Sequence, residues 1–560
     1  MTKSGVLAAF ALGSLLLSTS LLFAQTDNTY LAHAQRFAVS ARLDELAKQP
    51  QPLRYGYQEA NPVRYVPLPP YGEVVDPVEQ TSVASSSPSY AVGANLLGVG
   101  HGFPNYTIRA APPDTNMAVG DTQIVQWVDT AYAVCAKTSP YTCGPAINGN
   151  ILWQNLGGPC YNENSGDVIA QWDLVGHRWL LSENFFDFNG GEQPPYYVCV
   201  AISTSADANG TYYLYQFPVV NDGFPDYPKW GVWTNDYGQT WNNYGPGAAG
   251  WVGPVFCLYN RTKLLAGDPA AEQICHQYST RESSLLPADR DSVLAPPGSE
   301  DHFAIGSIGG VDHSHLSLYS GHINNPADWS QGATFTGDGN SQLIAVAPYN
   351  LLCNNNCVPQ KDVTDKLDSL GDRMMYRFAY WEDQPVANVK ATPPRPLPAQ
   401  HWLVSHSVQG SQGNAAIRWY EFTAPIRTVA VTSLSVFQQG TYAPDTQYRW
   451  MGSIARDKMG DILIGYSESS SSQYPSIYVA GRQVNDPVGL GNLEPEVLLV
   501  AGTGSQLDTS TRWGDYSAMR IDTADGMNGC TFWYTTEYYM ANASFAWSTR
   551  IGSAKFANCN

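Results

Sequence analysis

The sequence predicts an all-β chain folded as a β-propeller, for which seven blades fit best. Glycine (50), proline (38) and tyrosine (34) are abundant, whereas only 14% of the residues are charged. This composition is typical of strands joined by turns. A strand–turn–strand pattern recurs at intervals of roughly 50 to 80 residues, the length of a four-stranded blade with its loops. The 560 residues exceed one ordinary domain but suit such a repeat.

Each repeat has the same internal order. A short strand of small apolar residues comes first, as the crowded innermost strand of a blade requires, and a more aromatic strand follows a polar turn. The repeats begin near Asn116, Asp167, Pro228, His302, Asp372, Trp450 and Gly514. Six or eight blades are compatible with this pattern. Two stacked β-sandwich domains are the competing architecture, since they also alternate short strands and turns.

The chain begins with features of export. Lys3 is followed by an uncharged apolar run from Val6 to Ala24, which is typical of a secretory signal peptide cut after Ala24. An N-terminal membrane anchor is the alternative, because the run is close to the minimum length for spanning a bilayer. We expect residues 1–24 to be a signal peptide and the protein to be secreted, extracellular or periplasmic, without membrane insertion after signal removal.

Two segments separate the signal peptide from the repeats. In residues 25–49, apolar residues at helical spacing over 30–48 predict a short helix. Residues 50–92 are rich in Pro and Ser and predict an extended linker or a strap lying on the domain. A propeptide is an equally good interpretation of this part. The propeller domain is expected over residues 93–560.

Ten cysteines, an even number in a chain with features of export, predict disulfides. Proximity along the chain suggests the pairs Cys135–Cys143, Cys160–Cys199, Cys257–Cys275, Cys353–Cys357 and Cys530–Cys559. The cysteine spacings do not resemble a zinc site. The sequence predicts no metal ligand set and no cofactor, although a structural Ca2+ is compatible with it.

The charge and the missing motifs exclude several function classes. A formal net charge of −19 gives a surface that repels nucleic acid and anionic membranes. It still permits a neutral or cationic ligand, or an anionic ligand held by a local arginine cluster. The sequence has no GxSxG elbow, HExxH, P-loop or CxxCH, which argues against the enzyme classes that carry these motifs.

The predicted ligand site is the mouth of the central channel, where the innermost strands of a propeller begin. Polar and mostly charged residues recur just before these strands. They are Asp114, Asn116, Asp167, Asp226, Lys229, Asp301, His302, Asp372, Arg373, Arg449, Arg512 and Asp515. Carboxylates crowded at one place are costly unless cations, a metal or a ligand offset them.

Arg373, Arg449 and Arg512 precede the inner strands of three successive predicted blades. Such a cluster could hold a carboxylate or sulfate, because the guanidinium fork matches these groups. The alternative is that each arginine pairs with an aspartate of a neighbouring blade and ties the ring together.

Asp515 and Asp372 are the candidate acid–base residues. Glycoside cleavage needs two carboxyls facing across the scissile bond, or one carboxyl with another nucleophile. Glu537 and Tyr516 are candidate partners. Each of these residues could instead lie at the surface or make a structural hydrogen bond.

Two further kinds of side chain are candidates for the site. His302 could supply a base or bind a ligand. Trp450 and Trp513 could offer flat surfaces to sugar rings, although bulky aromatic residues also pack between blades because they bury a large area.

Several segments resemble a known group. Residues 234–241 (TNDYGQTW) have the pattern of an Asp box, a turn between outer strands of sialidase-like propellers, or alternatively a plain hairpin. FPDYPKWGVW and YRWMGSIARDKMGDILIGYS also resemble large secreted bacterial proteins with sialidase-like propellers and no established activity. In sialidases an arginine triad holds the substrate carboxylate, and Arg373, Arg449 and Arg512 echo that triad. A FRIP-type motif is missing, and no Tyr–Glu pair is identified.

The sequence therefore predicts a secreted propeller that binds, and could hydrolyse, an extracellular polysaccharide or glycoprotein glycan at the channel mouth. The enzyme would be a glycoside hydrolase of the sialidase type, with Asp515 or Asp372 as acid–base. A non-catalytic surface-interaction or binding protein is the alternative. A metal-dependent enzyme using Asp114, Asn116, Asp167 and Asp301 is a third class.

Overall fold

The computed structural model describes residues 24–559 except for 27, 52–58, 61–63, 68–71, 188–191, 283, 295–300, 308–312, 338–341, 384–398, 426–430, 432, 508–510 and 527–528. The predicted signal peptide lies outside the described residues up to its last position. Within the described part, no helix is long and apolar enough to cross a membrane.

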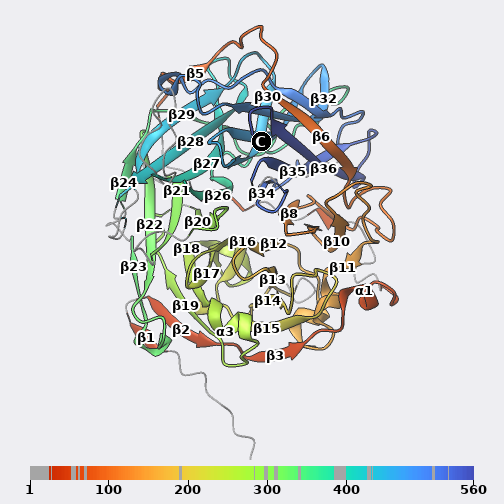
Figure 1. Cartoon of the computed structure of the whole chain (residues 1–560), viewed down its shortest axis with the longest axis vertical. Helices are drawn as coiled ribbons and strands as arrows, with labels where there is room; N and C mark the ends of the chain where they lie inside the picture. Colours follow the sequence, from red (N-terminus) through yellow and green to blue (C-terminus); the bar gives the residue numbers. More distant parts are fainter. Residues whose placement is uncertain are drawn as a thin grey trace, which may run out of the picture.

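The described chain is all-β, and its antiparallel sheets stand side by side round a common centre (Figure 1). From the innermost strand outward, the first sheet is β8 (Asn116–Val119), β9 (Gln123–Val128), β10 (Ala131–Ala136) and β11 (Ile147–Asn148). The second is β12 (Ile169–Asp173), β13 (Arg178–Phe185), β14 (Tyr197–Ser203) and β15 (Tyr212–Pro218). The third is β16 (Phe224–Val232), β17 (Asp236–Gly245), β18 (Ala249–Asn260) and β19 (Glu272–Gln277).

Two further strand sets share one sheet, because β20 (Leu285–Arg290) and β26 (Met375–Glu382) pair in parallel. Beyond β20 come β21 (His302–Ser307), β22 (His315–Ile323), β23 (Ala333–Thr336) and β24 (Gln342–Ala345). Beyond β26 come β27 (Ala399–Gln409), β28 (Ala415–Pro425) and β29 (Ser435–Tyr442), with β25 (Asn350–Leu351) beside β27. The last sheets are β30 (Tyr448–Arg456), β31 (Ile462–Ser470), β32 (Gln473–Arg482) and β33 (Val497–Val500), then β34 (Ala518–Asp522), β35 (Thr531–Tyr539) and β36 (Trp547–Phe556).

We call β8, β12, β16, β20, β26, β30 and β34 the inner strands. Each contacts the next along the chain, and β34 contacts β8. Every residue of β8, β12 and β20 is buried, so these strands show no alternation of buried and exposed side chains.

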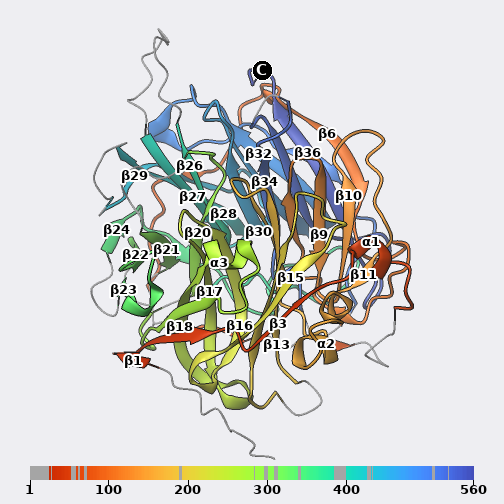
Figure 2. The ribbon, with the colours of Figure 1, turned by 60° about the horizontal axis from the view of Figure 1, so that its bottom comes forward.

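The N-terminal segment covers the outer edges of four sheets. β1 (Ala24–Thr26) pairs with β2 (Thr29–His33), which pairs with β19, and β3 (Arg36–Val39) pairs with β15. Further on, β5 (Glu79–Gln80) pairs with β29, β6 (Tyr90–Leu97) pairs with β36, and β4 (Glu59–Ala60) pairs with β7 (Ala110–Ala111). Figure 2 shows this segment, from β1 to α1 (Leu43–Leu46), lying across neighbouring sheets. Edge strands present unpaired backbone groups that such additions satisfy.

The helix predicted over residues 30–48 is therefore wrong except for the single turn α1. Residues 29–39 form β2 and β3, because the open edges of β19 and β15 offer backbone hydrogen bonds that outweigh a weak helical pattern. Leu43 and Leu46 of α1 are buried. The other α-helices among the described residues are α2 (Pro159–Asn162) and α3 (Arg261–Ala266).

The cysteine pairing predicted by proximity is confirmed. The disulfides are Cys135–Cys143, Cys160–Cys199, Cys257–Cys275, Cys353–Cys357 and Cys530–Cys559. The last of these joins the turn before β35 to the chain end beyond β36, so it fastens the final sheet.

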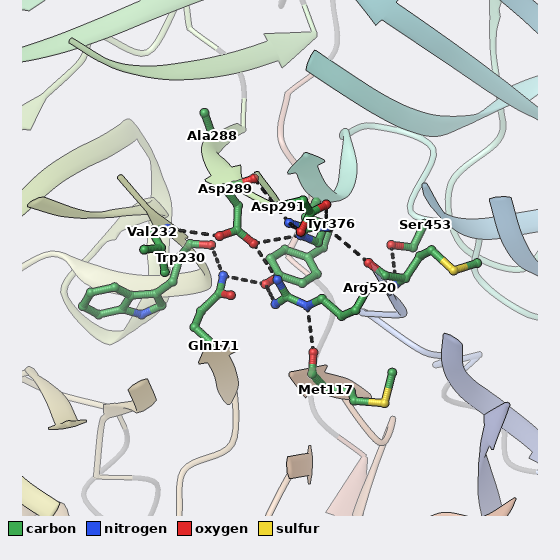
Figure 3. Close-up of polar contacts among 12 residues, drawn as sticks. Met117, Gln171, Trp230, Val232, Ala288, Asp289, Asp291, Tyr376, Ser453 and Arg520 are labelled. Atoms are coloured by element: carbon green, nitrogen blue, oxygen red, sulfur yellow. Dashed lines mark hydrogen bonds and ion pairs between the residues drawn. The ribbon is translucent and has the colours of Figure 1, made fainter. Parts of the chain in front are cut away.

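A buried polar network joins the inner strands at the centre (Figure 3). Arg520 of β34 donates to the carbonyl of Met117 in β8 at 2.9 Å and to Asp289 of β20 at 2.6 Å. Arg377 of β26 donates to Asp289 at 2.8 Å and to Asp291 at 2.6 and 2.7 Å. These four charged side chains are at most 8% exposed. Their mutual pairing offsets the cost of burying charge at the centre.

Candidate functional site

A buried group of charged side chains lies where the inner strands begin. We call it the charged cluster. Its members are Asp114, Asp129, Asp167, Asp226, Tyr227, Lys229, Asp372, Arg373, Arg512, Asp515 and Tyr516. They come from the approaches to β8, β12, β26 and β34, from β16 itself and from the turn after β9.

The backbone turns sharply on entering the inner strands. Asp114, Asp167, Tyr227 and Asp515 all have a positive φ, between 47° and 57°. Aspartate tolerates this left-handed conformation better than most residues. The repeated turn directs these side chains into one place although they are far apart in sequence.

Asp167 bonds to three other members of the cluster. It accepts a hydrogen bond from the Tyr516 hydroxyl at 2.5 Å and one from the Tyr227 amide at 3.2 Å. Its own amide donates to Asp114 at 3.4 Å. Burial, together with the charge of Asp167, raises the pKa of Tyr516 well above its usual value. The hydroxyl proton of Tyr516 therefore lies between the phenol oxygen and the carboxylate of Asp167.

Lys229 lies between two tyrosine rings. Its Nζ is 3.2 Å from the ring centre of Tyr227 and 3.5 Å from that of Tyr516, and it donates to the carbonyl of Pro228 at 2.9 Å. Burial lowers the pKa of Lys229 well below its usual value, while the charges of Asp167 and Asp515 oppose that shift. The π faces and the carboxylates favour the ammonium form, but the effect of burial on the pKa is the larger one.

The two arginines of the cluster are bound to aspartates of the same cluster. Arg373 donates to Asp372 at 2.8 and 3.0 Å, and Arg512 donates to Asp515 at 2.5 Å. Such charge-assisted pairs use the guanidinium donors that would otherwise grip an anionic ligand.

Three carboxyl groups of the cluster are incompletely bonded. Among the described residues, one oxygen each of Asp114, Asp129 and Asp515 is buried without a hydrogen-bond partner. Burial, reinforced by Asp515 and Asp167, raises the pKa of Asp114 well above its usual value. Burial, reinforced by Asp167 and Asp515, raises the pKa of Asp129 to about 8. Burial therefore favours the protonated, proton-donating form of both Asp114 and Asp129.

Several predicted site residues lie elsewhere. Arg449 binds Asp445, Glu468 and Glu496 within and beside the β30 sheet, so it does not join Arg373 and Arg512. His302 was predicted to precede an inner strand, but it begins β21, the second strand of its set, because β20 lies inside it. The ring nitrogens of His302 bond to Asp236 at 2.6 Å and to the carbonyl of Ala288 at 2.8 Å.

The remaining candidates support the fold around the cluster. Trp450 and Trp513 are buried with ring centres 5.8 Å apart, so they pack in the core rather than face a sugar. Asn116 accepts from the amide of Ala170 at 2.9 Å, and Glu537 accepts from the amide of Gly514 at 2.8 Å. Glu537 therefore holds the turn that carries Asp515.

Two members of the charged cluster and one residue beside it escaped sequence analysis. Tyr227 sits between Asp226 and Lys229, both of which were noted, and only its position in the same turn could have indicated it. Asp129 follows β9, the second strand of its set, where no ligand contact was expected. Arg64 belongs to the predicted linker, and it reaches Glu192 and Asp226.

Residues 234–241 form a plain hairpin. Residues 233–235 form the turn between β16 and β17, the first two strands counted from the centre, and Asp236 begins β17 and bonds to His302. An Asp box would lie between outer strands. Among the described residues there is also no group of three or more His, Cys, Asp or Glu side chains placed to hold a metal ion.

No protein-family model matches the chain, and no curated protein matches it. A protein of unknown function from Dyadobacter fermentans is 8% identical, with a TM-score of 0.32, over 84% of this chain and 100% of that one. An exo-beta-1,3-galactanase from Clostridium thermocellum is 10% identical, with a TM-score of 0.30, over 79% and 91%. The phage phi92 endosialidase is 8% identical, with a TM-score of 0.31, over 83% and 69%. The identities and TM-scores are too low for these likenesses to support an inference about activity.

Proposed function

We propose that this chain is a secreted, seven-bladed β-propeller that binds extracellular glycan at the charged cluster and hydrolyses a glycosidic bond there. Contact of each inner strand with the next, and of β34 with β8, supports a ring of blades over two separate sandwiches. The five disulfides support an oxidising compartment.

The observation that carries the catalytic part is the 2.5 Å hydrogen bond from Tyr516 to Asp167, with Asp114 beside them. Asp167 takes the phenol proton as the Tyr516 oxygen attacks the anomeric carbon. Asp114, whose protonated form is favoured by burial, gives its proton to the departing sugar oxygen. Water then releases the glycosyl group from Tyr516. The attacking water gives one proton to Asp114, which restores the acid. Asp167 gives its proton back to the phenol oxygen of Tyr516.

The roles differ from those predicted from the sequence. Asp372 and Asp515 are each bound to an arginine and serve to position Arg373 and Arg512. Tyr516 keeps the partner role predicted for it, with Asp167 in place of a glutamate. Asp114, first considered as a binding residue, becomes the acid.

The test is hydrolysis of a panel of neutral, acidic and amino-substituted oligosaccharides by the full chain. We expect Tyr516→Phe and Asp114→Asn each to lower kcat at least 100-fold, since acid–base and nucleophilic groups contribute on the order of 100 to 10,000-fold. Tyr215→Phe is the matched control, because its buried hydroxyl bonds to the carbonyl of Leu264 away from the cluster. No product from any substrate, or undiminished activity in both variants, would reject the catalytic part.

A non-catalytic glycan-binding protein is the second candidate. It is favoured by the local pairing of Arg373 with Asp372 and of Arg512 with Asp515, which engages both guanidinium groups within their own turns. Binding of an oligosaccharide that persists in Tyr516→Phe, with no product in either protein, would decide for this candidate.

A further inference from the structure

Residues 64–66 lie across the charged cluster. The amide of Val66 donates to Asp372 at 2.7 Å, and Arg373 donates to the carbonyl of Arg64 at 2.7 Å. The Tyr65 hydroxyl donates to Asp368 at 2.8 Å. A segment far upstream of the inner strands thus occupies polar groups of the proposed glycan site.

The guanidinium of Arg64 fills a receptor for a cation. It lies 2.7 Å from Glu192 and 3.4 Å from Asp226, and its central carbon is 4.2 Å from the ring centre of Phe224. The Arg64 side chain is only 13% exposed. Two carboxylates and an aromatic face are the groups that hold a desolvated cation.

The surrounding charges also favour a cationic ligand. Asp515, which is 8% exposed, keeps an oxygen without a hydrogen-bond partner among the described residues, and the carboxylate of Asp167 also acts on it. The basic side chains of the cluster already have negative or π partners: Arg373 holds Asp372, and Lys229 lies between two rings. An acidic sugar would therefore meet more unbalanced carboxyl groups than available cations.

We propose that Glu192, Asp226 and Phe224 form the cation subsite of this glycan site, that the ligand carries free amino groups, and that Arg64 occupies the subsite in its absence. This inference rests on the proposed glycan-binding function. In the bound state a protonated sugar amine replaces the guanidinium of Arg64. Two vicinal hydroxyls replace the backbone groups, because a hydroxyl can both donate and accept. One donates to Asp372 in place of the Val66 amide, and the other accepts from Arg373 in place of the Arg64 carbonyl.

The test is the binding of three oligosaccharides of equal length to the full chain: glucosamine, N-acetylglucosamine and galacturonate oligomers. We expect the glucosamine oligomer to bind at least tenfold more tightly than the acetylated one, and the galacturonate oligomer not to bind. Arg64→Gln should strengthen glucosamine binding about tenfold, because it removes the internal competitor, and Glu192→Gln should weaken it about tenfold. Raising the salt concentration should weaken this binding further.

Arg42→Gln is the matched control, since Arg42 also lies in the N-terminal segment but pairs with exposed Asp44 and Asp207. Equal binding of glucosamine and N-acetylglucosamine oligomers, or no change in both Arg64→Gln and Glu192→Gln, would overturn the inference. So would binding of an Arg-Tyr-Val peptide without binding of glucosamine oligomers.

The outcomes separate this inference from the proposed function. Tight binding of the glucosamine oligomer without hydrolysis would support the cation subsite and reject only the catalytic step. Hydrolysis of neutral oligosaccharides without preference for free amines rejects the subsite and leaves the proposed function.

Discussion

Arg520 donates to Asp289 at 2.6 Å, joining β34 near the end of the chain to β20, 231 residues earlier. Asp289 also accepts from Arg377 of β26 at 2.8 Å and from the amide of Val232 in β16 at 3.1 Å. One buried carboxylate thus links four inner strands. Because the inner strands carry the charged cluster at their beginnings, this link also holds the candidate site in shape.

Loss of Arg377 should destabilise the whole fold. Arg377→Met leaves Asp289 and Asp291 buried with fewer cations, and breaking a buried pair from one side costs about 3–5 kcal/mol. Chemical denaturation followed by tryptophan fluorescence measures the change. Arg42→Met, which removes an exposed pair, should leave the unfolding curve close to that of wild type. Equal effects of the two variants would contradict the role given to the central network.

Arg449 should matter for stability and not for ligand binding. Arg449→Met leaves Glu468, Glu496 and Asp445 without their shared cation, so we expect a loss of about 3 kcal/mol in the free energy of unfolding. Oligosaccharide affinity, measured by calorimetry below the unfolding temperature, should stay within twofold of wild type. A folded variant that no longer binds the oligosaccharide would show that Arg449 belongs to the ligand site.

Asp129 should make the protein less stable as pH rises. Burial, with Asp167 and Asp515, raises the pKa of Asp129 to about 8, whereas the carboxyl ionises near pH 4 in the unfolded chain. Between these two pH values the folded chain keeps the proton on Asp129, whereas the unfolded chain has lost it. The contribution of this proton to stability is complete below pH 4 and is lost as the pH rises to 8. Asp129→Asn abolishes this dependence and tolerates the same left-handed backbone.

We expect Asp129→Asn to exceed wild type in stability by a few kcal/mol at pH 8, with the difference shrinking toward pH 5. Unfolding curves recorded from pH 5 to pH 8 measure it. A difference that is constant over this range, or one that grows at low pH, would show that Asp129 is ionised in the folded protein.

The disulfide Cys530–Cys559 should stabilise more than Cys353–Cys357. The two bonds span 29 and 4 residues, and loop-closure entropy gives about 3–4 kcal/mol for the longer loop against about 2 for the shorter. Replacing both cysteines of each pair by serine, and comparing thermal unfolding, tests this order. The reverse order would mean that the final sheet is held mainly by the pairing of β6 with β36.

Local patterns predicted much of the strand content and misplaced one inner strand. The strands near Asn116, Trp450 and Gly514 were recognisable because each pairs with the next strand along the chain. The repeat at His302 was placed one strand too late. β20 contains Asp289 and Arg290, so its sequence lacks the apolar pattern expected of an inner strand. The arginines that pair with Asp289 belong to β26 and β34, which lie far away in the sequence.

The sequence by itself determined the all-β class and the disulfide pairs, because turn residues, aromatic strands and nearby cysteines act over short chain distances. Tertiary structure alone decided that Asp114, Asp167 and Tyr516 meet, that Arg449 does not join them, and that Arg64 covers the cluster. The energy of a charge depends on its neighbours in space, and the sheets bring these neighbours together from positions hundreds of residues apart.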